Sequence, residues 1–253
     1  MPYSVVRIDD SGPLRVLTLD RPAVMNAVDA GLNAELERAV DDFDERDDLR
    51  VMVVTGAGGN FCTGLDLKAF AATGVVPRGR RGFGGMTAIR PSKPVIAAVE
   101  GYAVAGGFEL VLACDLVVAA RDATFGLPEV RSGLVAIGGG AQLLPRRIPR
   151  ARAMDILLTG RFFTAPEADA WGLLAALAEP GQALLLAREF AEAIAANSPQ
   201  AIATTRGIVD AIERAGVAGL LPAGDDLTRS VTDSADAREG AAAFAEKRRP
   251  HWS

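Results

Sequence analysis

Residues 101–140 read GYAVAGGFELVLACDLVVAARDATFGLPEVRSGLVAIGGG, and the rest of the chain is organised around this stretch. It follows an apolar run at residues 94–99 whose length and composition predict a buried strand. The pair Gly106 and Gly107 lets the backbone turn sharply, because neither residue carries a Cβ, and helix-forming residues follow it. A helix that begins here presents unpaired N–H donors at the positive end of its dipole. The stretch therefore predicts a site for an anion, or for a carbonyl oxygen that becomes one.

Two carboxylates accompany this predicted helix start. Glu109 stands on its first turn, and Glu129 ends the sequence FGLPE at residues 125–129, after a strand-like run at residues 116–119. Carboxylates can carry protons in catalysis when their surroundings tune their pKa values. Together with the N–H donors, they predict acid–base chemistry beside a polarised carbonyl.

Composition narrows the class of protein. The chain has 253 residues, of which 49% are hydrophobic, and can bury a full core as one large domain or a domain with an appendage. A net charge of −5 and an isoelectric point near 5.1 do not favour a nucleic-acid or anionic-membrane partner. The start MPYSVVRIDD lacks the apolar run of a signal peptide, and no segment approaches the roughly 18 apolar residues of a membrane span. We therefore expect a cytoplasmic protein without a membrane partner.

The small number of histidines and cysteines limits the kinds of catalytic site that the chain can form. The only histidine is His251, close to the end of the chain, which argues against Ser-His-Asp, Cys-His and histidine-based metal sites. Cys62 and Cys114 are too few for a disulfide framework and are expected to be small core residues. No dinucleotide-binding or phosphate-loop glycine pattern occurs. Carboxylates remain as the proton carriers, with no metal and no separate cofactor expected.

The remaining pattern predicts alternating strands and helices up to about residue 180. Strands are expected at residues 3–9 and 14–19, which form a hairpin, and at 51–54. Helices are expected at 29–46, with Asp29 as its cap, and at 152–158, and the three glycines at 138–140 open another. Thr164 and Glu167 predict a capping box for a short helix that ends near Gly172. A second glycine-to-helix junction occurs at residues 60–70, with Asp66 in the first turn. Residues 182–248 are almost all helical in composition. This order predicts an α/β body with a helical tail that packs on the body or on a neighbouring subunit.

Residues 72–92 interrupt this order. They are rich in glycine and arginine and have no period, which predicts a mobile surface loop that shapes a substrate pocket. We expect Arg78, Arg80 and Arg81 to be solvated there rather than to form a phosphate clamp.

Three stretches together resemble the crotonase superfamily of enoyl-CoA hydratases and isomerases: residues 60–67, residues 93–109 and residues 125–129. Weaker matches lie at residues 21–27 and 238–248, so the likeness spans essentially the whole chain. The resemblance implies a spiral of β-β-α turns in residues 1–197 and a helical trimerisation region in residues 198–253. It also implies a homotrimer or a hexamer made of two trimers.

The resemblance assigns roles to particular positions. The backbone N–H groups of Leu65 and Gly106 match the two oxyanion donors that hold an acyl-CoA thioester, and Glu109 and Glu129 match the two catalytic glutamates of hydratases. CoA is part of the substrate and is not a separate cofactor. The positions implied to contact CoA are Val24, Ala27, Thr63, Asp66, Leu67, Lys68, Phe244 and Lys247, the last two from a neighbouring subunit.

Departures from the family pattern keep several reactions open. Ala136 and Ile137 replace a usual Pro-Gly in the loop that helps hold the water, Ala105 stands where a third glycine is frequent, and Glu100 replaces a common asparagine. Ala23 replaces a basic residue that often contacts the CoA phosphates. The presence of both glutamates favours an enoyl-CoA hydratase. An enoyl-CoA isomerase, which typically needs one glutamate, and a carnitinyl-CoA dehydratase are the alternatives.

The sequence disfavours two non-enzymatic functions. RNA binding, known for one relative in the superfamily, would need a lysine-rich helix face, whereas lysine occurs only at positions 68, 93 and 247. A catalytically silent scaffold would not need both glutamates. The sequence therefore favours an acyl-CoA enzyme with no nucleic-acid partner.

Overall fold

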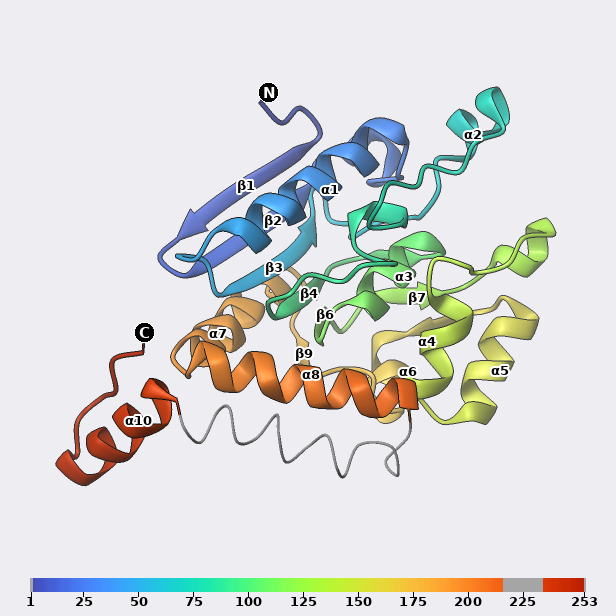
Figure 1. Ribbon diagram of the computed structural model, residues 1–253. Helices are drawn as coiled ribbons and strands as arrows, with labels where there is room; N and C mark the ends of the chain where they lie inside the picture. Colours follow the sequence, from blue (N-terminus) through green and yellow to red (C-terminus); the bar gives the residue numbers. More distant parts are fainter. Residues whose placement is uncertain (1, 216–233, 253) are drawn as a thin grey trace. The chain divides into compact units, whose positions relative to one another are not determined.

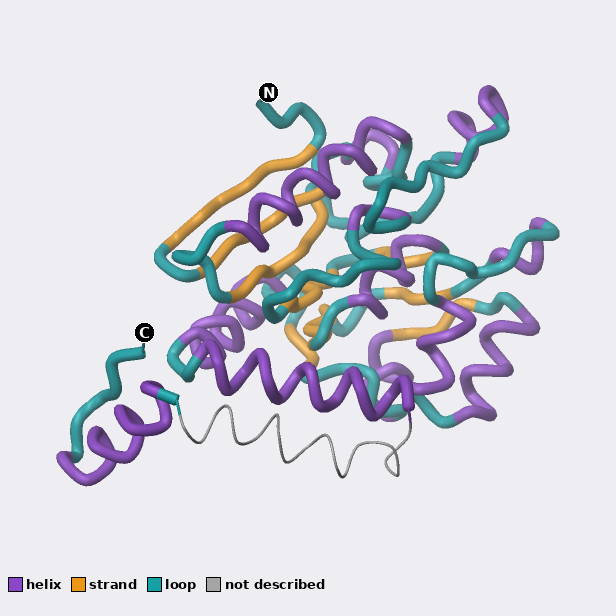
Figure 2. Tube along the Cα trace, in the orientation of Figure 1, coloured by secondary structure: helices purple, strands orange, loops and turns teal. Residues whose placement is uncertain are grey.

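The computed structural model describes residues 2–215 and 234–252, which form two compact units, Met1–Ala191 and Glu192–Ser253 (Figure 1). The division falls within helix α7 (Ala183–Ala195). Strands and helices alternate through the first unit, as the sequence predicts (Figure 2). The predicted boundary at residue 197 and the oligomerisation role of the region after it stay predictions.

The larger sheet of the first unit has six strands in the order β1-β2-β3-β4-β6-β9. Their bounds are Val6–Ser11, Leu14–Leu19, Val51–Gly56, Val95–Val99, Leu116–Ala120 and Ala176–Ala178. The first two form the predicted antiparallel hairpin, and every later pairing is parallel. β4 is buried along its whole length, as expected for a parallel strand covered on both faces.

A smaller sheet of three strands, in the order β5-β7-β8, carries the junction that leads into the site. Its strands are Tyr102–Val104, Thr124–Gly126 and Phe162–Thr164. β5 lies between the predicted strand at residues 94–99 and the predicted helix start at Gly106, and its three residues were too short a run for the sequence to reveal.

The helices of the first unit are α1 (Ala30–Glu45), α2 (Leu67–Thr73), α3 (Gly106–Ala113), α4 (Gly140–Arg147), α5 (Arg150–Thr159) and α6 (Ala165–Ala170), with short 3-10 turns η1 (Pro22–Val24), η2 (Phe83–Gly85) and η3 (Glu129–Ser132). Asp29 caps α1 by accepting a hydrogen bond from the Leu32 N–H group, as predicted. Thr164 and Glu167 form the predicted capping box of α6. α1 packs on β1 and β2, while α3 contacts β5, η2 and α4.

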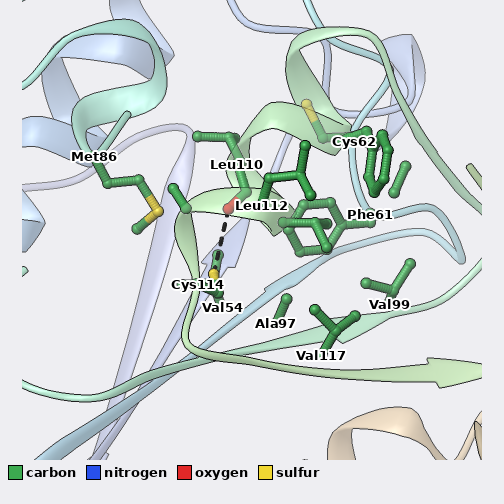
Figure 3. Packing of buried hydrophobic residues seen from close by; sticks show 14 of the residues in the cluster. Val54, Phe61, Cys62, Met86, Ala97, Val99, Leu110, Leu112, Cys114 and Val117 are labelled. Atoms are coloured by element: carbon green, nitrogen blue, oxygen red, sulfur yellow. Dashed lines mark hydrogen bonds between the residues drawn. The ribbon is translucent and has the colours of Figure 1, made fainter. Parts of the chain in front are cut away.

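The core gathers around α3 and the parallel strands (Figure 3). Cys62 and Cys114 are fully buried in it, and burial raises the pKa of each thiol to about 12. Cys114 donates to the Leu110 carbonyl at 3.3 Å, and Cys62 donates to the Asn26 carbonyl at 3.1 Å. Both are core residues, as the sequence predicts.

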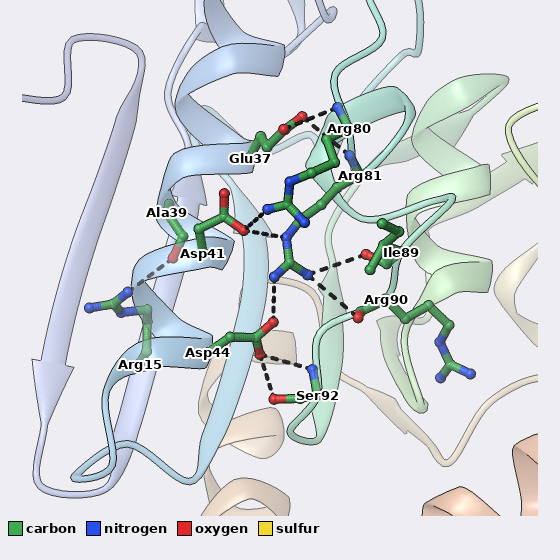
Figure 4. Close-up of polar contacts among 10 residues, drawn as sticks. All are labelled: Arg15, Glu37, Ala39, Asp41, Asp44, Arg80, Arg81, Ile89, Arg90 and Ser92. Carbon is green, nitrogen blue, oxygen red and sulfur yellow. Dashed lines mark hydrogen bonds and ion pairs between the residues drawn. The ribbon is translucent and has the colours of Figure 1, made fainter.

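The expectation of a solvated loop at residues 72–92 is wrong for its second half. Arg81 is only 6% exposed, and its guanidinium donates to Asp41 and to Asp44, each at 2.6 Å (Figure 4). Phe83 and Met86 lie in the core. The segment is held in place by carboxylates of α1 that are distant in sequence, so the composition of the segment itself could not reveal them. Arg78 and Arg80 are exposed, as expected.

The second compact unit contains the end of α7 together with α8 (Pro199–Ala215) and α10 (Ala235–Glu246). Ser198 accepts a hydrogen bond from the Ala201 N–H group and donates to Asp236 at 2.5 Å, which joins the starts of α8 and α10. The Trp252 indole donates to the Ala196 carbonyl at 2.7 Å and ties the tail to the same region. Across residues 2–215 and 234–252, none of the helices combines the length and apolar character needed to cross a membrane.

Candidate active site

A cavity of about 590 Å³ lies in the first unit and is lined by parts of residues 63–67, 76–83, 104–109 and 128–138. This volume is within the range of about 300–1,000 Å³ that small-molecule sites occupy. Its lining includes Leu65, Gly106, Glu109 and Glu129, the four residues that the sequence singles out for chemistry. The structure therefore brings all four to one cavity, although they come from three separate segments.

The two predicted N–H donors are available for a ligand. Gly106 is the first residue of α3, so its N–H has no partner inside the helix. Within residues 2–215 and 234–252, neither the Leu65 N–H nor the Gly106 N–H donates a hydrogen bond to another protein group. Leu65 is held from both sides, because the Val28 N–H donates to the Gly64 carbonyl and the Asp66 N–H donates to the Val28 carbonyl.

Gly64 brings these two donors together. Its φ of +84° favours glycine, and a Cβ at this position would lie 2.7 Å from the Gly106 nitrogen and 2.8 Å from the Ala105 Cβ. Any side chain here would separate the two segments. The predicted oxyanion donors thus stand beside each other because residue 64 has no side chain.

Ala105 precedes the second donor and has an unusual backbone conformation, with φ +50° and ψ −131°. A residue with a Cβ is strained there, and a glycine would not be. This is the position at which the family often has a third glycine. The strain is located at the turn from β5 into α3 that aims the Gly106 N–H into the cavity.

Glu109 lies one helical turn into α3 and is 5% exposed. The Gly140 N–H, at the start of α4, donates to its Oε1 at 2.9 Å, and the nearby Gly138 N–H lowers the pKa of the same carboxyl. A Cβ on Gly138 would lie 2.5 Å from Glu109 Oε2, so the approach requires glycine. Gly138, Gly139 and Gly140 indicate a helix start in the sequence. Only the fold reveals that this helix start binds the Glu109 carboxylate.

Glu129 occupies a different environment at the start of η3. Its Oε2 is buried and accepts no hydrogen bond from any residue of the described ranges. Burial, together with the nearby Glu109 charge, raises the pKa of Glu129 to about 7. Burial also raises the pKa of Glu109, but the N–H groups of Gly140 and Gly138 and the charge of Arg78 oppose that rise. The pair is therefore asymmetric: Glu109 is the better stabilised carboxylate, and Glu129 is the better holder of a proton.

The residues predicted to contact CoA lie in three places. Thr63 and Leu67 line the cavity. Asp66 caps α2 by accepting hydrogen bonds from the Lys68 and Ala69 N–H groups at 3.2 and 3.1 Å, and Lys68 itself is exposed. A structural role for Asp66 is thus confirmed, while the CoA contacts stay predictions.

Val24 and Ala27 lie on the loop before α1, which is fixed by two polar residues whose roles the sequence did not reveal. Arg21 bonds to the Ala27 carbonyl and pairs with Asp66 at 3.3 Å. Asn26 is fully buried, with its side-chain amide bonded to the Ala57, Asn60 and Phe61 carbonyls. A lone asparagine beside apolar residues was the available signal for this buried polar anchor.

Phe244 and Lys247 lie in the second compact unit, where Phe244 is 88% exposed. Their contribution to a neighbouring subunit's CoA site stays a prediction. In the part of the chain that the structure describes, no group of three or more His, Cys, Asp or Glu side chains is arranged to hold a metal ion.

A family model and solved structures identify the same family of proteins as similar to this chain. The family model for enoyl-CoA hydratase/isomerase matches residues 10–253. The crystal structure of enoyl-CoA hydratase from Mycobacterium tuberculosis H37Rv superposes with a TM-score of 0.94 at 46% identity, covering 98% of both chains. This match confirms the predicted spiral fold, though not the trimerisation region.

Curated relatives point to more than one reaction. The mevalonyl-coenzyme A hydratase of Aspergillus fumigatus is 40% identical over 243 residues, covering 94% of this chain and 90% of that protein. The carnitinyl-CoA dehydratase of Salmonella arizonae is 41% identical over 256 residues, covering 98% of this chain and 97% of that protein.

Proposed function

Because the chain belongs to the enoyl-CoA hydratase/isomerase family, the crotonase superfamily, we propose that it is a hydratase that adds water across the 2,3 double bond of a 2-enoyl-CoA. The observation that carries this proposal is the meeting of two unlike glutamates and two unengaged N–H donors in one cavity. Water addition requires one group that accepts a proton and another that supplies one.

The N–H groups of Leu65 and Gly106 bind the thioester oxygen and stabilise it as it becomes an enolate. A donor of this kind is worth roughly 2.7–4 kcal/mol of barrier. Both are backbone groups held by the surrounding structure, so no reorganisation is needed when charge develops on the oxygen. The acyl chain then extends along the apolar wall of the cavity, past the two carboxyls.

Glu109 accepts a proton from the attacking water as its oxygen forms the bond to C3. The Gly140 N–H orients this carboxylate and favours its ionised form before the reaction begins. Glu129, whose pKa is about 7, donates its proton to C2 as the enolate collapses. The two glutamates end with exchanged protonation states, and proton exchange with solvent restores them.

The alternatives differ in their demand for the second carboxyl. An isomerase moves one proton along the acyl chain and can use a single base. A proton-holding Glu129 beside Glu109, with a buried Oε2 that accepts no hydrogen bond from the described residues, favours water addition. A carnitinyl-CoA dehydratase would use the same pair in reverse, and Ile137, which lines the cavity and is 56% exposed, stands where it can affect the water.

The test compares Glu109→Gln and Glu129→Gln with the wild-type protein. Each substitution keeps the shape of the side chain and removes its proton capacity, so each should lower the rate of hydration of a short 2-enoyl-CoA by about 10²–10⁴-fold. The double variant should lose much less than the product of the single losses. Hydration is followed by loss of conjugated absorbance, beside isomerisation of a 3-enoyl-CoA. Intact hydration in Glu109→Gln would refute the proposal, and a wild-type protein that isomerises without hydrating would favour the isomerase.

Assembly and location complete the proposal. We expect a homotrimer or a hexamer in the cytoplasm, with Phe244 and Lys247 reaching a neighbour's CoA site, and a stable monomer at micromolar concentration in sedimentation would contradict it. RNA binding gains no support, because Lys93 donates to the Phe43 and Arg46 carbonyls at 2.9 and 2.6 Å.

A further inference from the structure

Arg78, Arg80 and Arg81 lie close together in the sequence of the segment that lines the cavity. Helix α1 binds Arg80 and Arg81 (Figure 4). Arg80 pairs with Asp41, and Arg81 pairs with Asp41 and Asp44. Glu37, the next carboxylate along α1, accepts the backbone N–H groups of Arg80 and Arg81 at 3.1 and 3.4 Å. The acidic face of α1 is thus occupied by these two residues.

The third arginine, Arg78, lines the catalytic cavity. No ion pair or hydrogen bond joins its guanidinium to another residue in ranges 2–215 and 234–252, and its charge still acts on Glu109 through space. The other cation of the cavity wall is engaged elsewhere, because Arg131 donates to the Thr159 carbonyl at 3.2 Å and lies over the Phe162 ring. Arg78 is therefore a cation of the cavity without an ion-pair partner in the described part of the chain.

The position of Arg78 points to the acyl part of a substrate. It belongs to the same segment as Phe83, whose ring packs against Gly106: a Cβ on that glycine would lie 2.4 Å from the ring. The segment therefore forms the wall beside the predicted thioester site. The cavity lining also includes apolar residues, with Val76 on the same segment and Leu134 and Val135 on another.

An acyl chain that covers this wall would also cover the Arg78 charge. A plain alkyl chain would shield the guanidinium from water without offering it a partner, which is unfavourable. A trimethylammonium group would add a like charge. A carboxylate would be repelled by the carboxylate of Glu109 unless a cation received it, and Arg78 provides a planar donor suited to carboxylate oxygens.

We propose that Arg78 is a specificity-determining residue that favours 2-enoyl-CoA substrates whose acyl chain carries a carboxylate at or beyond C4. The proposal rests on the hydratase function proposed above, and it names the substrate class for the same site. It predicts discrimination by charge among chains of similar length.

The test uses three thioesters that share one but-2-enoyl-CoA unit and differ only in the group on C4: a carboxylate, a methyl group or a trimethylammonium group. We expect the kcat/KM for hydration of the carboxylate to exceed that of the methyl compound about tenfold, with the trimethylammonium compound lowest. Arg78→Gln should remove this order, and Arg78→Glu should reverse it. Arg80→Gln, a change on the same segment away from the cavity, should leave it unchanged.

Several outcomes would overturn the proposal, and they are distinguishable. A wild-type protein that hydrates the methyl compound but shows no preference among the three refutes the role of Arg78 and leaves the hydratase standing. An equal loss on all three in Arg78→Gln, with weaker inhibition by free CoA, would assign Arg78 to the CoA phosphates instead. Hydration of none of the three would refute the hydratase as well. Thermal melting of each variant verifies that it is folded.

Discussion

Replacing Glu129 by Gln should stabilise the protein at alkaline pH while abolishing most of its hydration activity. Its raised pKa means that the folded state holds the Glu129 proton more tightly than the unfolded state does. The stabilisation from this proton is fully present below the ordinary glutamate value of 4.5 and is lost as the pH rises through about 7. Glutamine is neutral throughout and does not suffer this loss.

The size of the stability gain in Glu129→Gln follows from how far the pKa of Glu129 is raised on folding. A rise in the pKa from 4.5 to about 7 corresponds to an upper limit of about 3 kcal/mol at 1.36 kcal/mol per pKa unit. The Glu129 side chain is only partly buried and borders an open cavity, so solvent screening reduces the expected gain to roughly 1–2 kcal/mol. The gain should grow between about pH 4.5 and pH 7 and be constant above that.

The assay is urea denaturation of the wild type and Glu129→Gln at pH 4.5 and pH 8.5, at one fixed protein concentration because assembly affects apparent stability. Glu179→Gln, a change at an exposed carboxylate paired with Arg121, is the matched control and should show no such pH-dependent gain. The kcat/KM for hydration by the wild type should also fall above about pH 7, because Glu129 then loses the proton that it donates in the proposed reaction.

The result that would refute this reasoning is a stability difference between the wild type and Glu129→Gln that does not change with pH. Such a result would mean that Glu129 is solvated in the folded protein and holds no proton near neutrality. The division of roles between the two glutamates would then lose its physical basis, even if both remained necessary for activity.

Three further substitutions test the residues that hold the segments around the cavity in place. Arg81→Ala should lower the free energy of unfolding by about 3 kcal/mol in urea denaturation, because it leaves carboxylates of α1 without their buried partner, whereas Arg80→Ala on the exposed neighbour should change it little. Gly138→Ala should reduce hydration kcat/KM roughly 10²-fold by displacing Glu109, with little change in melting temperature. Ala105→Gly should raise the free energy of unfolding by about 1 kcal/mol through relief of its backbone strain, and a loss of stability would show that the turn is not strained.

Elements with a local chemical signature were predictable from the sequence. The helix after Asp29 has both a cap and an apolar stripe, and the helix after Thr164 has a capping box. The glycine pair at 106 and 107 marks the start of α3 because only a residue without a side chain fits so close to its neighbours: a Cβ on Gly107 would lie 2.0 Å from the Cys62 carbonyl oxygen. The two helix caps depend on residues near one another in the chain, whereas the need for glycine at position 107 is set by Cys62, which lies far earlier in the sequence.

The segment at residues 72–92 was not predictable in this way. Its composition favours a mobile loop, but Arg81 is buried because its partners lie some forty positions earlier on α1. A signal did exist: Glu37, Asp41 and Asp44 have the spacing of one helix face. That spacing indicated an acidic helix face that could bind cations. It did not indicate whether Arg78, Arg80 or Arg81 would bind there.

The environments that distinguish the two glutamates are likewise absent from the sequence, where both catalytic candidates are the same residue type. What distinguishes them is their hydrogen bonds: Glu109 receives the Gly140 N–H at the start of α4, while Glu129 receives none from the described residues at its buried Oε2. Since α4 begins some thirty residues after Glu109, this difference arises only when the fold brings the two segments together. Two equivalent carboxyls would share a proton and favour neither direction of transfer. An ionised base facing a protonated acid is the arrangement that water addition needs, and it is therefore the environment of the glutamates, more than their presence, that favours a hydratase.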